Sequence, residues 1–190
     1  MDQTTINTHQ ELIDACKKCD RSAQFKIYKL YYKAMYNTSL RIVNDTAEAE
    51  DIMQDSFLDA FRRLGSYTGE GTFGSWLKRI VINNSLDTLR KEKDVVSLDE
   101  EEIDLSEEIP DQDEELVQAQ VMEIKSAISE LPEDYRVVLS LFLLEGYDHE
   151  EISEILNISN NLSRTRFVRA KQKVYSIIMA KRFQRTVQSN

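Results

Sequence analysis

Apolar residues in the first half of the chain recur at steps of three and four, which is the spacing of one buried helical stripe. Residues 22–43 are therefore predicted to form a helix that buries Phe25, Tyr28, Tyr32, Met35 and Ile42. A second helix is predicted to start at Asp45, whose side chain suits an N-cap, and to stop at Gly65. A third helix is predicted over residues 73–93.

The second half of the chain has the same periodicity in shorter segments. Helices are predicted over residues 116–131 and 133–144, separated at Pro132, because proline disfavours a helical conformation at the residue before it. Asp148 is a predicted N-cap for the next helix, which leads through a short turn into a longer basic helix. Two helices joined by a short turn are the outline of a helix-turn-helix, whose second helix enters the major groove of DNA.

Composition supports an all-α fold. The 190 residues include only 5 Gly and 2 Pro, which is too few turn residues for an all-β protein. We expect two small helical domains, residues 1–94 and 116–190, joined by a flexible acidic linker over residues 95–115. That linker carries eleven acids and no base, so it has too much like charge to build a core.

Charge is segregated along the chain, so the net charge of −10 misleads. Residues 160–190 contain no acid, and they carry eight bases: Arg164, Arg166, Arg169, Lys171, Lys173, Lys181, Arg182 and Arg185. A basic tract on the second helix of a helix-turn-helix favours DNA binding. On the predicted helix before Gly65, one face is instead acidic, and a solvated surface is the simplest interpretation of such a row.

Several kinds of chemistry are disfavoured by the sequence. Cys16 and Cys19 form a lone C-x-x-C without further zinc ligands, so we interpret them as half-buried thiols on a first helix. His149 begins an H-E-x-x-H pattern, but Ser153 stands where the second His is needed. We expect no catalytic residue, no cofactor and no metal. No apolar run is long enough to span a bilayer or to form a signal peptide, so we expect a cytoplasmic protein without membrane insertion.

The segment AEAEDIMQDSFLDAFRRL resembles region 2.2 of the extracytoplasmic-function (ECF) sigma factors, the small two-domain initiation factors of bacterial RNA polymerase. In that family an A-E-D-x-x-Q-x-x-F pattern on one helix docks on the polymerase clamp. The resemblance implies four polymerase-binding residues: Asp51, Gln54, Asp55 and Phe57. It also gives the acidic row a partner, because a negative helix face suits a basic surface.

The segment TFGSWLKRIVINNSLDTLRK resembles regions 2.3 and 2.4 of the same family, which melt and read the minus-ten promoter element. Aromatic faces could stack on unpaired bases, Asn83 could bind a flipped base, and basic residues could hold phosphates. Trp76 equally fits a core position, so its role stays open. The residues implied are Tyr67, Phe73, Trp76, Lys78, Arg79, Asn83, Asp87 and Arg90.

The segments LPEDYRVVLSLFLLEGYDHEEISEILNIS and RAKQKV resemble region 4 of these sigma factors, which reads the minus-thirty-five element as duplex. Asn161 and Leu162 depart from the Gly-Thr pair that commonly opens the family's recognition helix, which puts the base contacts there in doubt. The minus-thirty-five residues implied are Ser163, Arg164, Arg166, Arg169 and Lys171.

The resemblance implies three partners: core RNA polymerase, through its clamp and flap, promoter DNA and an anti-sigma factor. The predicted linker would thread the polymerase toward its RNA exit path, where a polyanion suits a basic channel. A stand-alone DNA-binding regulator and an adaptor made of two helical bundles remain the alternatives. The helical first half, which carries both sigma-like patterns, favours the sigma factor.

Overall fold

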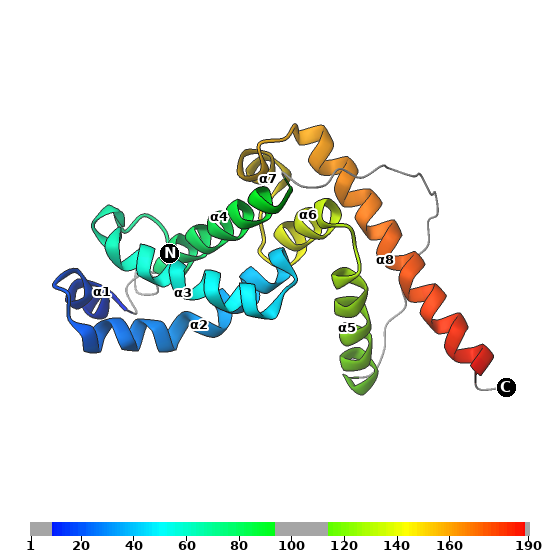
Figure 1. The fold of residues 1–190 in the computed structure, drawn as a ribbon, viewed down its shortest axis with the longest axis horizontal. Helices are drawn as coiled ribbons and strands as arrows, with labels where there is room; N and C mark the ends of the chain where they lie inside the picture. Colours follow the sequence, from blue (N-terminus) through cyan, green and yellow to red (C-terminus); the bar gives the residue numbers. More distant parts are fainter. Residues whose placement is uncertain (1–8, 94–113, 189–190) are drawn as a thin grey trace. The chain divides into compact units, whose positions relative to one another are not determined.

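The computed structural model describes residues 9–93 and 114–188, and throughout these ranges the regular structure is helical (Figure 1). The chain divides into two compact units, Met1–Ser97 and Leu98–Asn190. The predicted all-α class is confirmed. The predicted linker over residues 95–115 lies outside the described residues, apart from its last two residues, which begin a helix.

Unit 1 is a bundle in which three long helices pack on one another. Its elements are α1 (Gln10–Lys17), α2 (Arg21–Val43), α3 (Thr46–Arg62), the short 3-10 turn η2 (Leu64–Ser66) and α4 (Phe73–Lys93). Local chemistry sets the ends of α2 and α3. Asp20 accepts hydrogen bonds from the first turn of α2, and Asp45 accepts one from the N–H of Glu48 at 2.9 Å. Asn44 ends α2 in the left-handed conformation at φ 63°.

Small hydroxyl side chains lie where the helices of unit 1 meet. Ser39 on α2 and Ser85 on α4 are fully buried, and their Oγ atoms are 3.0 Å apart. Ser56 on α3 is also fully buried, and its Oγ accepts a 3.0 Å hydrogen bond from the amide of Asn84 on α4. Because each contact pairs polar atoms without a bulky side chain, α2 and α3 can approach α4 closely.

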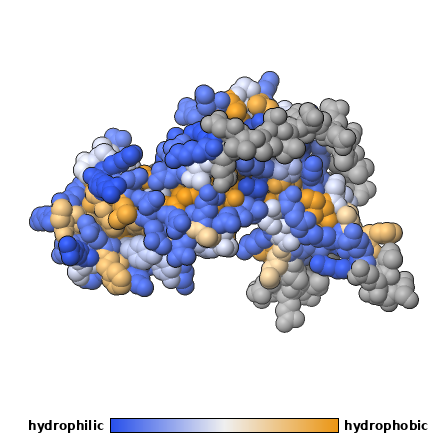
Figure 2. Space-filling view, in the orientation of Figure 1, coloured by the Kyte–Doolittle hydropathy of each residue, from blue (hydrophilic) through white to orange (hydrophobic). Residues whose placement is uncertain are grey.

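Two expectations for unit 1 are corrected. Phe25 is 60% exposed, because the buried stripe of α2 begins with Ala23 and Ile27 before it reaches the predicted position Met35. Phe25 is therefore an exposed apolar side chain of this unit. Figure 2 shows apolar patches on a surface that is otherwise mostly hydrophilic. Cys16 is buried on α1, and this burial, followed by the charge of Asp20, raises the pKa of its thiol. Cys19 is exposed beyond the helix end at φ 61°, so the two thiols are not alike.

Unit 2 contains the expected helix-turn-helix. Its helices are α5 (Glu114–Ser129), α6 (Glu133–Leu143), α7 (His149–Leu156) and α8 (Asn160–Gln188), and α5, α6 and α7 all pack against α8. Asp148 forms a capping box at α7: its carboxylate accepts from the N–H of Glu151, whose own carboxylate accepts from the Asp148 N–H at 2.9 Å. Asn157 then reverses the chain at φ 54° before α8.

The second half of α8 is attached to α5 by ion pairs. Arg182 lies 2.8 Å and Arg185 3.6 Å from the carboxylate of Glu123, whose pKa is lowered chiefly by its hydrogen bond to Arg182. Lys181 pairs with Glu130, the residue that follows the end of α5. Three bases of the predicted basic tract therefore bind other parts of unit 2. Val121 and Ile124, two apolar residues of α5, are 41% and 44% exposed.

Replacing Ser85 tests the close packing of unit 1. Ser85→Leu forces extra methyl groups into the contact with Ser39, and we expect the free energy of unfolding to fall by about 1–3 kcal/mol. Ser85→Ala removes the hydrogen bonds of the Ser85 hydroxyl to Ser39 and to the Val81 carbonyl without adding bulk, and should cost about 1 kcal/mol. Urea unfolding followed by the fluorescence of Trp76, the single Trp of the chain, reports on unit 1 alone. Equal stability of Ser85→Leu and the wild type would contradict this packing.

Candidate polymerase and nucleic-acid interfaces

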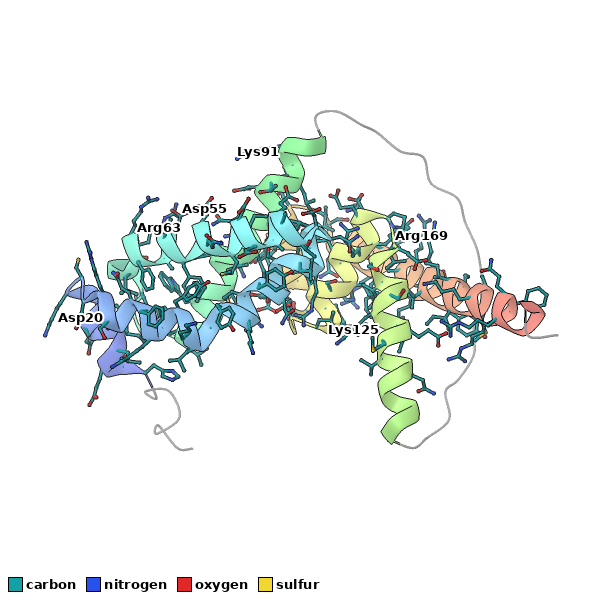
Figure 3. All side chains as sticks on the ribbon, turned by 60° about the horizontal axis from the view of Figure 1, so that its bottom comes forward. Asp20, Asp55, Arg63, Lys91, Lys125 and Arg169 are labelled. Carbon is teal, nitrogen blue, oxygen red and sulfur yellow. The ribbon has the colours of Figure 1, made fainter. Side chains whose placement is uncertain are left out.

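The outer face of α3 carries the predicted acidic surface. Asp51, Gln54 and Asp55 are all exposed, and Asp55 projects outward from α3 in Figure 3. The Gln54 amide donates a 3.4 Å hydrogen bond to Glu50 on the preceding turn, so the surface is continuous with a fourth polar side chain. These groups lie on one side of a helix whose opposite side enters the core.

Phe57, the fourth predicted polymerase-binding residue, is buried. Its side chain is only 3% exposed, and its ring meets the rings of Tyr28 and Phe61 at 5.0 Å and 6.1 Å. In this conformation Phe57 is unavailable to a partner protein. Its contacts with Tyr28 instead hold α3 against α2 and so fix the direction in which the acidic face points.

An aromatic groove beside the acidic face is a feature that the sequence analysis missed. Its volume is about 340 Å³, and it is lined by Tyr28, Tyr32, Lys33, Tyr36, Asn37, Glu50 and Met53. The rings of Tyr28 and Tyr32 stack at 5.6 Å. The sequence contained a signal for it, since tyrosine stands at residues 28, 32 and 36, and a half-buried tyrosine presents an apolar ring together with a polar tip.

The aromatic residues before and within α4 form a packed cluster. Tyr67 and Phe73 are 5% and 4% exposed, and their rings lie 5.6 Å apart in an edge-to-face contact. The Tyr67 hydroxyl donates to the carbonyl of Gly71 at 3.0 Å. Trp76 is half-buried against both rings at 5.5 Å. Contrary to our expectation, the faces of Tyr67 and Phe73 are not open to bases in this conformation, because they hold the glycine-containing loop on α4.

The exposed face of α4 carries the remaining predicted minus-ten residues. Arg79, Asn83, Asp87 and Arg90 are exposed and follow one another by three or four positions, so they share one side of the helix. Arg90 pairs with Asp87 at 2.9 Å. Lys78 lies partly buried at the edge of this face. The structure also separates Asn83 from its neighbour Asn84, which binds Ser56 in the bundle.

Two of the predicted minus-thirty-five residues lie in packing contacts. Ser163 is fully buried, and its Oγ lies 2.9 Å from Nδ1 of His149. Arg166 pairs with Asp134 of α6 at 2.6 Å. In this conformation both side chains make contacts that orient α8 on α6 and α7, and their contacts with the minus-thirty-five element stay predictions.

The other three predicted residues of α8 remain at or near the surface. Arg164 is exposed, and its Nε donates a 2.8 Å hydrogen bond to the side chain of Asn160. Lys171 is exposed with its ammonium 5.1 Å from the ring centre of Phe167. Arg169 is partly buried on the same helix (Figure 3).

His149 is a second residue whose role was missed, because the sequence offered only an incomplete zinc pattern. Its ring stacks on Phe142 at 4.7 Å and meets Phe167 edge-on at 5.4 Å. Burial, followed by the positive charge of Arg164, lowers the pKa of His149, and the nearby Asp148 carboxylate opposes this shift. The neutral imidazole thus joins α7 to α8 through Ser163.

Comparison with known proteins defines the class. The family Sigma-70 region 2 matches residues 27–95, and Sigma-70 region 4 matches residues 121–174. The RNA polymerase sigma-H factor of Pseudomonas aeruginosa is 27% identical over 180 residues, which cover 90% of this chain and 93% of that protein. The ECF RNA polymerase sigma factor SigW of Bacillus subtilis is 31% identical over 84% of this chain and 91% of its own length. The chain belongs to the ECF sigma factors, which direct promoter-specific initiation by RNA polymerase.

Solved structures share this fold. The structure of CnrH in complex with the cytosolic domain of CnrY is similar with a TM-score of 0.54 and 18% identity, over 89% of this chain and 96% of that one. The sigma factor RpoE of Bartonella quintana, in complex with the anti-sigma factor NepR, is similar with a TM-score of 0.55 and 19% identity, over 81% and 95% of the two chains.

Residues 9–93 and 114–188 contain neither a metal-binding cluster nor a membrane-spanning helix. Among them, no group of three or more His, Cys, Asp or Glu side chains is placed to hold a metal ion. Within the same ranges, no helix has both the length and the apolar character that a bilayer span requires.

Lowering the pH tests the contact between His149 on α7 and Ser163 on α8. Because the folded-state pKa lies below the ordinary value of about 6.5, His149 favours folding fully above pH 6.5, and this contribution is lost as the pH falls below that value. We expect amide hydrogen exchange in α7 and α8 to accelerate between pH 7.5 and 5.5, after correction for the intrinsic rate.

The variant His149→Gln is the control for this experiment, because an amide can bond to Ser163 but does not titrate. We expect its exchange to show less of the acid-induced acceleration. The chain has only two histidines, so the pKa itself can be read from the ring protons by NMR. A measured pKa of His149 at or above 6.5 would contradict the lowered pKa that its burial implies.

Proposed function

We propose that the two units divide the work of a sigma factor between them. Residues 1–94 bind core RNA polymerase and the minus-ten element, and residues 116–190 bind the minus-thirty-five element. The observation that supports this division is the arrangement of exposed charge: α3 presents acids, whereas the outer side of α8 presents bases. An acidic surface suits a basic protein partner, and a basic surface suits nucleic acid.

The polymerase surface comprises the acidic face of α3 and the aromatic groove next to it. Asp51 and Asp55 attract a basic clamp element over a distance and raise the rate of association. The stacked rings of Tyr28 and Tyr32 then supply apolar contact area of the kind that dominates the energy of protein interfaces. Glu50 belongs to both surfaces, since it lines the groove and bonds to Gln54.

The exposed face of α4 reads the melted minus-ten element. Asn83 has a side chain that can bond to the edge of a flipped base, while Arg79 and Arg90 are suited to phosphate contacts. The cluster of Tyr67, Phe73 and Trp76 supports this surface by fixing the preceding loop on α4. Of the three rings, only that of Trp76 is exposed enough to touch a base.

The outer side of α8 binds the minus-thirty-five duplex. Arg164 contacts base edges, and Arg169 and Lys171 neutralise phosphates. His149, Ser163 and the pair of Arg166 with Asp134 orient the helix for these contacts.

Protein partners of unit 2 dock on apolar residues beyond the DNA-binding part of α8. Tyr175, Met179 and Phe183 are exposed at four-residue steps and form one strip. Such a strip suits the polymerase flap or an anti-sigma factor, which would compete for it.

The protein acts in the cytoplasm, where RNA polymerase is, and has no enzymatic activity of its own. The acidic linker lies outside the described residues, and its passage through the polymerase rests on the family resemblance.

Transcription with purified components tests the proposed function. The protein is mixed with core RNA polymerase, passed through gel filtration and supplied with a library of genomic fragments for run-off transcription. Co-elution with the polymerase and transcripts from defined start sites are expected. Failure to bind polymerase, combined with retardation of duplex DNA by the protein alone, would instead indicate a stand-alone regulator.

Charge reversal on α3 tests the polymerase surface. We expect Asp51→Lys combined with Asp55→Lys to weaken binding to core polymerase by about tenfold or more, because attraction to a basic clamp becomes repulsion. The loss should come mainly from slower association and should shrink as salt is added. Binding kinetics measured by surface plasmon resonance at 50 and 300 mM salt test this prediction.

Asp14→Lys is a matched control for that charge reversal, because Asp14 is exposed on α1 outside the proposed surface. Its affinity for polymerase should stay within about twofold of the wild type. If the double α3 variant and the α1 control lose affinity equally, net charge rather than the α3 face determines binding.

A further inference from the structure

The first two turns of α8 leave few side chains available to a base pair. Ser163 is buried against His149, Arg166 pairs with Asp134, and Phe167 packs against α6. The side chains that are exposed in these turns are Asn161, Leu162, Arg164 and Thr165. N-terminal residues of a recognition helix are the ones that contact base edges, so specificity must come from this small set.

Arg164 is the member of this set that the structure holds in a defined orientation. Its Nε donates to Oδ1 of Asn160, one helical turn earlier, at 2.8 Å. With Nε occupied, the two terminal amino groups Nη1 and Nη2 are the donors that remain for DNA. Among the described residues, no carboxylate pairs with Arg164, so its charge is not neutralised there as that of Arg166 is.

Two donors at the end of a planar guanidinium match the two acceptors, N7 and O6, that guanine presents in the major groove. A hydrogen bond that holds the guanidinium before binding lowers the entropy lost when an arginine side chain is immobilised. Arg164 has both properties: its two terminal amino groups are available as donors, and its hydrogen bond to Asn160 holds the guanidinium before DNA binds. Asn161 and Leu162 replace the Gly-Thr pair that is common in the family, so base contacts at those positions cannot be transferred to this chain.

We propose that Arg164 reads a guanine in the minus-thirty-five duplex and that Asn160 is the positioning residue that presents its guanidinium. The inference rests on the proposed function, because it requires α8 to lie in the major groove. It adds the class of base that is recognised and the side chain that fixes the reading geometry.

The experiment starts from the wild-type protein bound to core polymerase. The complex selects from a pool of promoter duplexes randomised upstream of the minus-ten element, and the enriched sequences are read. Relative affinities are then measured for all four base pairs at each enriched position. We expect one position with a strong preference for G·C that is reduced by about tenfold or more in Arg164→Ala, while preferences at other positions persist.

Variants at Asn160 separate positioning from simple loss of structure. Asn160→Ala removes the acceptor and should reduce the guanine preference by about two- to tenfold. Asn160→Gln keeps an uncharged amide oxygen that can still accept from Arg164 one turn later, and should retain most of the preference. The matched control Lys171→Ala removes an exposed charge that is proposed to neutralise a phosphate, so it should weaken binding to all sequences alike and reduce the salt slope by about one.

The possible outcomes test the inference and the proposed function separately. A guanine preference that survives in Arg164→Ala overturns the inference and leaves the proposed function standing. A loss in Asn160→Gln equal to that in Asn160→Ala overturns the positioning role. If the wild-type complex enriches no sequence at all, the proposed function fails and the inference falls with it.

Discussion

The ion pair between Arg166 and Asp134 shows the constraint on which unit 2 depends: α8 must use some of its basic residues to hold itself in the fold and others to meet a partner. Arg166 binds α6, Arg182 and Arg185 bind Glu123 of α5, and Lys181 binds Glu130 just beyond the end of α5. These contacts fix how the helix lies on its neighbours. The outer side keeps Arg164 and Lys171, and its direction follows from the inner contacts.

In unit 1, packing contacts rather than ion pairs fix the positions of the helices. Buried hydroxyl groups at Ser39, Ser56 and Ser85 let the helices approach closely, and Phe57 holds α3 against α2. The two outward surfaces, acidic on α3 and mixed polar on α4, are therefore parts of one rigid bundle. A partner that binds α3 and a nucleic acid that binds α4 would meet a frame whose geometry is already set.

The sequence predicted helix positions well and side-chain environments less well. Helix ends depend on local signals such as Asp20, Asp45 and Asp148, and the observed bounds lie within a few residues of the predicted ones. Motif positions did not reveal that Phe57, Tyr67, Phe73 and Ser163 are buried, because a spacing of three or four residues does not say which side faces the core. The pair of Arg166 with Asp134 joins residues 32 positions apart and could not be read from local pattern. His149 was missed for the same reason, since its partner Ser163 lies on another helix.

Exchanging the charges of the α6–α8 pair tests the central claim that the bases of α8 are divided between the fold and DNA. The variant with both Asp134→Arg and Arg166→Asp keeps an ion pair but removes the base from α8. If Arg166 serves the fold, we expect Arg166→Asp alone to destabilise unit 2 and abolish promoter binding by the polymerase complex, and the double exchange to recover most of both. A double exchange that restores stability but not promoter affinity would show that Arg166 contacts DNA and would contradict the account.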